Sequence, residues 1–511
     1  MKKLFFIFLI AIINSLSAFT ENYKVNLDVD VKSDYQSLKK GSKVHFKDLQ
    51  CEEVVIFSTS KPDLQYLLVL EDDTKIKING KIEKKLAFKY KNVQDIWDSE
   101  IICNVLDELQ KKGIQEKLRA EMESDALEYI YKIKSNGMEL NDPYLENYIY
   151  SLVAQITPEV FIDGRPCNVN ILIVDDPSMN AGMFPNGTLV INTGLLAGLH
   201  TEDELVAILS HEIGHFVLDH SIQNVNKAKD RKKRAEFWSA VATGLVAVAE
   251  GVAAAKSSYY VPGAATAAAA ALTTSISNVI CERLGMEYNH EQEYEADEVA
   301  KKILEYTHRD TNALATSFTR MADNMARDRS SMMYFSSFSH PALTERIEKA
   351  GTPNLKKKDV EFERQISFAI SSAARMKYED RRFSQVIPLV SQNIDNGVAT
   401  TIDYILKANC LLAVKNDQTS NNEAMELVNK AKEIDPNNIN VRKAEILTTL
   451  RLGKKNEAIN LLSSYKQILD GQFNSLKEYS GTKMWDEFNN FYSLESDWIK
   501  RMTLKLRGMS I

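Results

Sequence analysis

Apolar residues recur at intervals of three and four residues along the segment that begins at Leu205 and ends at Phe216. This spacing places them on one face of an α-helix. Thr201 and Glu204 stand just before it in the order T-x-x-E, the arrangement of a capping box at the start of a helix. The pattern therefore predicts a buried helix that begins near Thr201.

The first hundred residues have a different pattern, in which short apolar runs alternate with turn sequences such as Asn79-Gly80. The runs of strand length lie near Val44, Val54, Tyr66, Lys75 and Lys85. We expect a β-rich module over residues 19–100, and we assign it no function beyond a contact or lid role.

Helical spacing returns at residues 142–156, and we expect this helix to pack beside the one that begins near Thr201. A buried strand follows from Val169. Asn186-Gly187 is a favoured two-residue hairpin turn, and a second strand runs from Thr188 to Asn192. The mixture predicts an α+β fold for residues 101–354, mainly helical with a small sheet and hairpin.

From residue 355 to residue 511 the pattern is helical throughout. The small residues Ala424 and Ala458 are 34 positions apart, which is the period of the tetratricopeptide repeat, and Pro436 stands where one such unit would end. We predict a tetratricopeptide-like helical domain in this region. A helical tail without repeats is the alternative.

The helix that begins near Thr201 contains the sequence HEIGH, in which His211 and His215 are four residues apart. This spacing puts both rings on one face, one turn apart, where they can bind one zinc ion. Glu212 lies beside them, so its carboxylate can take a proton from a water molecule at the metal. Chance occurrence is the alternative, and the helical context argues against it.

A catalytic zinc ion needs a third protein ligand and an open fourth position. A second helix, predicted from Glu287 to Tyr306, carries Glu293 and Asp297 on one face. We predict that Glu293 is the third ligand and that Asp297 accepts a hydrogen bond from a ligand histidine. Spacing alone also leaves open an acidic, solvated helix face, because further glutamates crowd the segment. These are Glu287, Glu291, Glu295 and Glu298.

Four segments in this order resemble one group of zinc peptidases, the gluzincins related to the CAAX prenyl endopeptidase and the bacterial inner-membrane heat-shock protease. They are Met179–Leu196, Glu204–His220, Glu291–Asp297 and Ser339–Ile347. The resemblance covers residues 116–350 and implies that the first glutamate of E-x-x-x-D, here Glu293, binds the metal. The architecture resembles most the periplasmic branch, in which tetratricopeptide repeats follow the peptidase domain and which is linked to outer-membrane protein quality control.

The fourth segment contains two further candidate catalytic residues, His340 and Arg346. The resemblance implies that His340 can occupy the fourth zinc position and block it; the alternatives are that it caps or orients a helix, or assists the reaction. Arg346 either stabilises the oxyanion of a tetrahedral intermediate or pairs with an acidic residue near the metal. His220 is expected on the opposite side of the zinc helix, in a structural role.

Residues 1–18 have the pattern of a secretory signal peptide, and an uncleaved membrane anchor is the alternative. Lys2 and Lys3 precede an apolar run, and cleavage is expected near Ser17 or Ala18. We therefore predict an exported protein of the periplasm or cell envelope. The alanine-rich residues 236–280 predict a helical pair that is buried or touches a membrane peripherally, rather than true membrane spans.

Composition narrows the partners of this chain of 511 residues. Its formal net charge of −7 argues against nucleic acid as a principal partner. The five cysteines are scattered without a CxxC pair. We expect them to be buried small apolar residues, although an exported protein could form one or two disulfides.

Together these patterns predict an exported zinc metalloendopeptidase with one zinc ion, acting on unfolded or misassembled envelope proteins or peptides. The repeats would contact the outer-membrane assembly machinery. We expect substrate to add as an extended strand to a sheet edge at the cleft, formed by Thr188, Leu189, Val190, Ile191 and Asn192. The alternative is a chaperone or assembly factor whose repeats bind envelope proteins, with a blocked site or little proteolysis.

Overall fold

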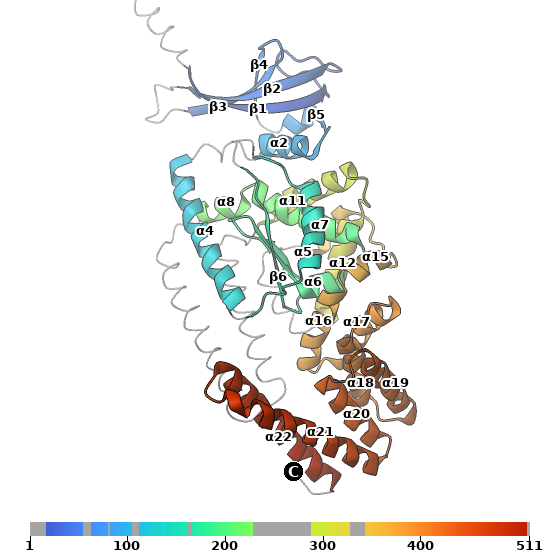
Figure 1. Ribbon diagram of the computed structural model, residues 1–511. Helices are drawn as coiled ribbons and strands as arrows, with labels where there is room; N and C mark the ends of the chain where they lie inside the picture. Colours follow the sequence, from blue (N-terminus) through green and yellow to red (C-terminus); the bar gives the residue numbers. More distant parts are fainter. Residues whose placement is uncertain are drawn as a thin grey trace, which may run out of the picture. The chain divides into compact units, whose positions relative to one another are not determined.

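The computed structural model describes residues 17–54, 63–79, 82–104, 112–135, 137–161, 166–227, 288–327 and 343–507. These residues form two compact units, one ending at Phe362 and the other starting at Glu363 (Figure 1). Helices dominate both, and small sheets occur in the first, so the predicted α+β class is confirmed.

Two predicted segments lie outside this description. Residues 1–16 of the predicted signal peptide are one of them, whereas Ser17 and Ala18 begin the first strand. Residues 236–280, predicted as a helical pair, are the other. Within the described ranges, no helix has the length and apolar character needed to cross a membrane.

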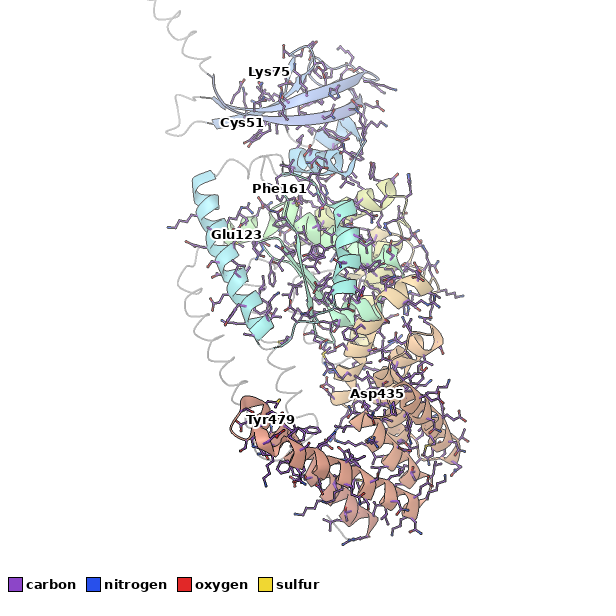
Figure 2. All side chains as sticks on the ribbon, in the orientation of Figure 1. Cys51, Lys75, Glu123, Phe161, Asp435 and Tyr479 are labelled. Carbon is purple, nitrogen blue, oxygen red and sulfur yellow. The ribbon has the colours of Figure 1, made fainter. Side chains whose placement is uncertain are left out.

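The N-terminal module is a five-stranded antiparallel sheet with the strand order β4-β3-β2-β1-β5. Its strands are β1 (Ser17–Val31), β2 (Lys43–Val54), β3 (Asp63–Leu70), β4 (Lys75–Lys77) and β5 (Leu86–Lys89). Figure 2 marks Cys51 on β2 and Lys75 on β4. β1 was not among the predicted strands, although its alternation of apolar and polar residues is typical of a half-buried strand. The alternating buried residues are Val25, Leu27, Val29 and Val31.

Helix α2 (Val93–Asn104) joins this sheet to the helices that follow, and it is buried over most of its length. The indole Nε1 of Trp97 donates to the carbonyl of Ile156, 2.8 Å away. Glu100, which is 4% exposed, forms an ion pair with Lys302. The N-terminal module is therefore fixed to the same unit as the HEIGH helix.

The rest of the first unit places helices around a small sheet. Its helices are α4 (Lys112–Ser135), α5 (Pro143–Ile156), α6 (Thr193–Gly198), α7 (Glu202–Val217), α8 (His220–Lys227), α11 (His290–Tyr306), α12 (Ala313–Arg327) and α14 (Leu343–Ala350). As expected from the sequence, α5 packs beside α7, which carries HEIGH. Helix α11 also packs along α7, so two segments far apart in sequence lie side by side.

The small sheet corrects the prediction for Thr188–Asn192. Its strands are β6 (Asn170–Val174), β7 (Ala181–Met183) and β8 (Thr188–Asn192), in the order β6-β8-β7. β8 is the central strand, parallel to β6 and antiparallel to β7. Its backbone is paired on both sides, so it is not a sheet edge and cannot accept a substrate strand.

The hairpin between β7 and β8 is one residue wider than the predicted two-residue turn. Phe184 N donates to Thr188 O, and Gly187 N donates to Phe184 O, both at 2.9 Å. Pro185, Asn186 and Gly187 therefore form the connection. Gly187 has φ of +81°, and a Cβ there would lie 2.3 Å from the carbonyl oxygen of Asn168. Both the left-handed backbone and the close approach require glycine.

The second unit is all-helical, and its boundary falls within α15 (Val360–Gln365), later than the expected boundary after residue 354. Its longer helices are α16 (Ser367–Glu379), α17 (Phe383–Asp395), α18 (Thr401–Val414), α19 (Gln418–Ile434), α20 (Ile439–Arg451), α21 (Lys455–Leu476) and α22 (Lys483–Leu506). Consecutive helices pack on each other, and Ala424 and Ala458 are fully buried.

Four of the five cysteines lie in the described residues. Cys51 and Cys410 are buried, as expected for small apolar residues, while Cys103 and Cys167 are partly exposed. Burial raises the pKa of the Cys410 thiol to about 12, which keeps it protonated. The Cys410 thiol is therefore not suited to act as a nucleophile.

Candidate metal centre

The start of α7 is fixed by side chains that the sequence pattern identified. The Thr201 hydroxyl accepts a hydrogen bond from Glu204 N, at 3.2 Å. The Glu204 carboxylate reaches one residue further back than in a capping box and accepts from His200 N, at 3.2 Å. Arg320 Nε also donates to Glu204, at 2.8 Å. The helix therefore starts at a fixed point, which sets the direction of every side chain along it.

Helix α11 supplies the facing side of the site. The Asn289 side chain accepts from the backbone of Gln292, whose own side chain accepts from Asn289 N, and this capping box begins the helix. Glu293 follows immediately and is completely buried. Gly214 of α7 lies against Ala296 of α11: a Cβ on Gly214 would be 3.4 Å from Ala296 Cα. The two helices thus approach closely between the predicted ligands.

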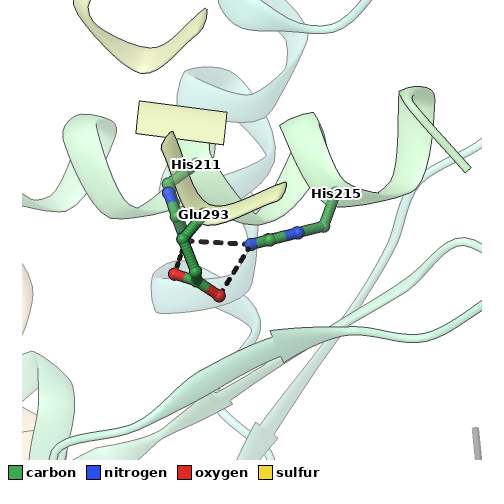
Figure 3. Close-up of side chains that lie close together, drawn as sticks. All are labelled: His211, His215 and Glu293. Carbon is green, nitrogen blue, oxygen red and sulfur yellow. Dashed lines mark hydrogen bonds and ion pairs between the residues drawn. The ribbon is translucent and has the colours of Figure 1, made fainter. Parts of the chain in front are cut away.

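His211, His215 and Glu293 converge from α7 and α11, as Figure 3 shows. The Nε2 atoms of the two histidines are 3.1 Å apart. His211 Nε2 and His215 Nε2 each lie 3.6 Å from a carboxylate oxygen of Glu293. Ligand atoms bound tetrahedrally to zinc at its usual bond lengths stand about 3.4 Å apart. The donor types and their separations therefore fit a zinc ion.

A second layer of charge surrounds these ligands. Asp297 Oδ1 lies 2.9 Å from His211 Nδ1, so the carboxylate can accept the ring proton and turn Nε2 toward the metal position. Arg346 of α14 is 1% exposed and bridges two carboxylates of α11. Its Nε and Nη2 donate to Asp297 at 2.8 and 2.7 Å, and its Nη1 lies 2.5 Å from Glu293 Oε2.

This clustering changes the titration of both partners. Burial alone would raise the pKa of Asp297, but hydrogen bonds from Arg346 and His211 lower it to about 2. Burial would lower the pKa of Arg346, but the nearby carboxylates of Asp297, Glu293 and Glu212 raise it. Of the two roles predicted for Arg346, the geometry corresponds to pairing with acidic residues near the metal.

The remaining predicted residues fall in different places. Glu212 is 3% exposed and follows His211 on α7, where its charge acts on Arg346. His340 lies outside the described residues. The five residues of β8 form the centre of the sheet and contribute no edge to the site.

Sequence reasoning missed two residues that contact His215. The Tyr288 ring stacks on the His215 ring, with centroids 3.6 Å apart and planes 9° apart. His220 was expected on the far side of α7, yet its Nδ1 lies 2.8 Å from His215 Nδ1. No periodic signal identifies Tyr288. His220 could have been placed correctly only if the end of α7 at Val217 had been recognised, and the pattern of apolar residues does not reveal that end.

Two histidines of an HExxH helix and a glutamate from a second helix, beside a small mixed sheet, define a metallopeptidase domain of the gluzincin type. Residues 143–353 match the model of peptidase family M48. The match confirms the resemblance drawn from the four sequence segments.

Individual relatives agree with this assignment. The chain is 25% identical over 198 residues to the putative beta-barrel assembly-enhancing protease of Vibrio cholerae, covering 38% of this chain and 36% of that protein. It is 26% identical to the metalloprotease YcaL and 29% identical to the metalloprotease LoiP of Escherichia coli, in each case over 37% of this chain and 62% of the relative. The chain thus spans less than two thirds of each of these relatives.

Proposed function

We propose that the chain is a zinc metalloendopeptidase that binds one zinc ion through His211, His215 and Glu293. The observation that carries this proposal is the convergence of three buried ligand atoms at separations suited to zinc. When bound, the ion would polarise the scissile carbonyl and lower the pKa of its water toward neutrality. The match to peptidase family M48 supports hydrolysis of peptide bonds as the reaction.

Three residues around the proposed ion have different roles. Glu212 accepts the proton of the attacking water on its carboxylate and passes it to the leaving amine. Asp297 holds the ring of His211 through Nδ1, and Arg346 balances the buried charges of Asp297 and Glu293. Arg346 is committed to these carboxylates, so we propose a positioning role for it rather than oxyanion stabilisation.

The substrate-binding edge is proposed to be β7. Its residue pairs alternate, and Gly182 faces β8 in a hydrogen-bonded pair with Val190. The backbone groups of Ala181 and Met183 therefore point away from β8. In the described ranges no strand pairs with this side of β7. The strand β7 itself contacts α7, the helix that carries HEIGH. An extended peptide could add there through main-chain hydrogen bonds.

A cellular role in the envelope is also proposed. The signal-peptide pattern at residues 1–18 supports export, and a relative is named a putative beta-barrel assembly-enhancing protease. We propose unfolded or misassembled envelope proteins as the substrates, captured by the second unit as a tetratricopeptide-like surface. A blocking role for His340 also remains a proposal.

Metal analysis of purified variants tests the site. Glu293→Ala and His211→Ala should lose zinc, because each removes one of three ligands. Glu212→Gln should keep zinc at full stoichiometry and lose peptide cleavage, because Glu212 is assigned proton transfer. Glu298→Ala, an exposed glutamate on the same helix, is the matched control and should retain both. Full zinc occupancy in Glu293→Ala would overturn the assignment of the third ligand.

A further inference from the structure

The two ligand histidines are held by different partners. His211 directly contacts the carboxylate of Asp297. His215 instead contacts a second histidine, since its Nδ1 lies 2.8 Å from Nδ1 of His220. The other ring nitrogen of His220, Nε2, lies 3.1 Å from Glu295 Oε2. His215, His220 and Glu295 thus form a chain of hydrogen bonds that leads away from the metal position.

The protonation of His215 determines which ring nitrogen of His220 carries a proton. His215 Nε2 faces His211 and Glu293, so it must be unprotonated to bind a metal, and its proton is then on Nδ1. In the contact with His220, that proton is donated to Nδ1 of His220, which must then be unprotonated. The proton of His220 is then on Nε2, from which it is donated to the Glu295 carboxylate. Each nitrogen or oxygen in this series of hydrogen bonds is therefore either a donor or an acceptor, without conflict.

The backbone places His220 for this contact. Helix α7 ends at Val217, and Asp219 adopts a left-handed conformation with φ of +55°. Arg119 Nη2 holds the Asp219 carboxylate at 2.7 Å. This turn starts α8 at His220 and directs its fully buried ring back onto His215. Aspartate tolerates this conformation better than most residues, so the turn is compatible with its sequence.

A neighbouring contact holds the same ligand from its face. Tyr288 stacks on the His215 ring, and its hydroxyl lies 3.1 Å from Ser221 Oγ. Ser221 follows His220 directly, so the first two residues of α8 restrain His215 in two ways. One contact fixes the rotation of the ring through Nδ1, and the other fixes the plane of the ring.

We infer that His220, supported by Glu295, is a positioning residue that sets the tautomer and orientation of the zinc ligand His215. This inference rests on the proposed zinc site and deepens it. Partners of this kind that bind the second nitrogen of a ligand histidine contribute about 10–100-fold to metal affinity. His220 would act through His215 and would not itself contact zinc or substrate.

Zinc affinity of the full-length protein, measured by competition with a chromogenic chelator, tests this role. His220→Leu fills the space without an acceptor and should bind zinc about 10–100-fold more weakly. His220→Asn puts an amide oxygen where Nδ1 was, so it should restore affinity to within about threefold of wild type. The absorption spectrum of the cobalt-substituted protein should change in His220→Leu and be restored in His220→Asn.

Ile222→Ala is the control for loss of packing, because Ile222 is buried on the same helix and packs against Leu118 and Met122. It should destabilise the fold and leave zinc affinity unchanged. Affinity of His220→Leu equal to wild type, or equal losses in His220→Leu, His220→Asn and Ile222→Ala, would overturn the inference. Glu293→Ala tests the proposed metal site separately from the role of His220. If this variant binds zinc as tightly as wild type, the proposed metal site itself is wrong.

Discussion

Arg346 shows how one side chain can serve two carboxylates with different tasks. Its guanidinium contacts Glu293, a proposed ligand, and Asp297, which holds the ring of His211. Two buried carboxylates so close together repel each other unless a cation lies between them. Arginine suits this place because its planar fork reaches both partners at once. It also lies over the Phe318 ring, at 4.2 Å from the centroid.

Arg346→Ala is therefore expected to lower the free energy of unfolding by about 3–5 kcal/mol, because it leaves buried charges without a partner. Arg346→Lys should recover only part of this loss, since an ammonium group cannot bridge both carboxylates. Denaturant unfolding of the metal-free protein measures the effect. Lys134→Ala, which breaks the surface pair with Glu139, should cost at most about 1 kcal/mol. A wild-type midpoint for Arg346→Ala would contradict the reasoning.

The residues of the site divide clearly into those that the sequence could predict and those that it could not. His211, Glu212 and His215 follow from local spacing, and the resemblance selected Glu293 among several glutamates. His220 was misplaced because helical periodicity was extended past Val217, where the helix ends. The left-handed Asp219 reverses the chain there. Such a turn depends on a partner 100 residues away, Arg119, which no local pattern reveals.

At the scale of elements, strand order was the main error. The strand at Thr188–Asn192 and the presence of a hairpin before it were predicted correctly, because turn chemistry and apolar runs are local signals, although the turn is one residue wider than expected. Its second neighbour, β6, pairs from the other side through a register that begins at Asn170 and Thr188. Long-range pairing of this kind has no local signature, so an internal strand was mistaken for an edge.

Proline substitution distinguishes the two strands. Met183→Pro removes an N–H that points away from β8, so the sheet should remain intact, zinc should stay bound and KM for peptides should rise at least about tenfold. Val190→Pro removes an N–H within the central ladder and should unfold the domain. Peptide cleavage kinetics and zinc content give the comparison. Unchanged KM in a folded Met183→Pro variant would argue that substrate binds elsewhere.

Helix α2 carries an acidic residue whose protonation should affect stability. Asp98 is 6% exposed, and burial raises its pKa to about 6, with a smaller contribution from Asp95 opposed by a hydrogen bond from Gln94. A carboxyl group whose pKa is raised on folding stabilises the protein below its unfolded pKa, near 4. That contribution is lost as the pH rises through about 6.

Asp98→Asn should therefore stabilise the protein by about 2–3 kcal/mol at pH 8, and this gain should vanish toward pH 4. The amide keeps an oxygen for Gln94 Nε2, which donates to Asp98 Oδ1 at 2.8 Å. Thermal unfolding of both proteins across this pH range is the measurement. Asp323→Asn, on the exposed face of α12, serves as the control. A gain that does not depend on pH would refute the assigned pKa.

At the scale of the whole molecule, the first unit extends past the last peptidase motif. Lys357 Nζ lies 3.2 Å from Asp203 and 3.1 Å from Asp310, and Asp359 N donates to His200 O at 2.8 Å. Phe362 is 2% exposed. The expected boundary after residue 354 would remove these contacts, which join the chain to the start of α7.

A chain ending at Phe362 should fold, bind zinc and cleave short unstructured peptides, because it keeps every described contact of the metal centre. It should lose cleavage of natural clients if the second unit captures them. A chain ending at Asn354 should bind zinc but unfold at a lower temperature. Zinc content, melting temperature and cleavage of both substrate types should be compared. Loss of zinc in the chain that ends at Phe362 would mean that the second unit is needed for the peptidase fold.

The contact between Gly214 and Ala296 has a consequence for which ion the protein selects. A methyl group at position 214 would just touch α11, and any larger side chain would push the two helices apart. The histidine nitrogens and the glutamate oxygens would separate with them. A wider opening suits ions with longer bonds, whereas the observed spacing suits bonds of about 2.0–2.2 Å. At the proposed site, the closeness of two backbones would therefore favour a small ion as much as the donor atoms do.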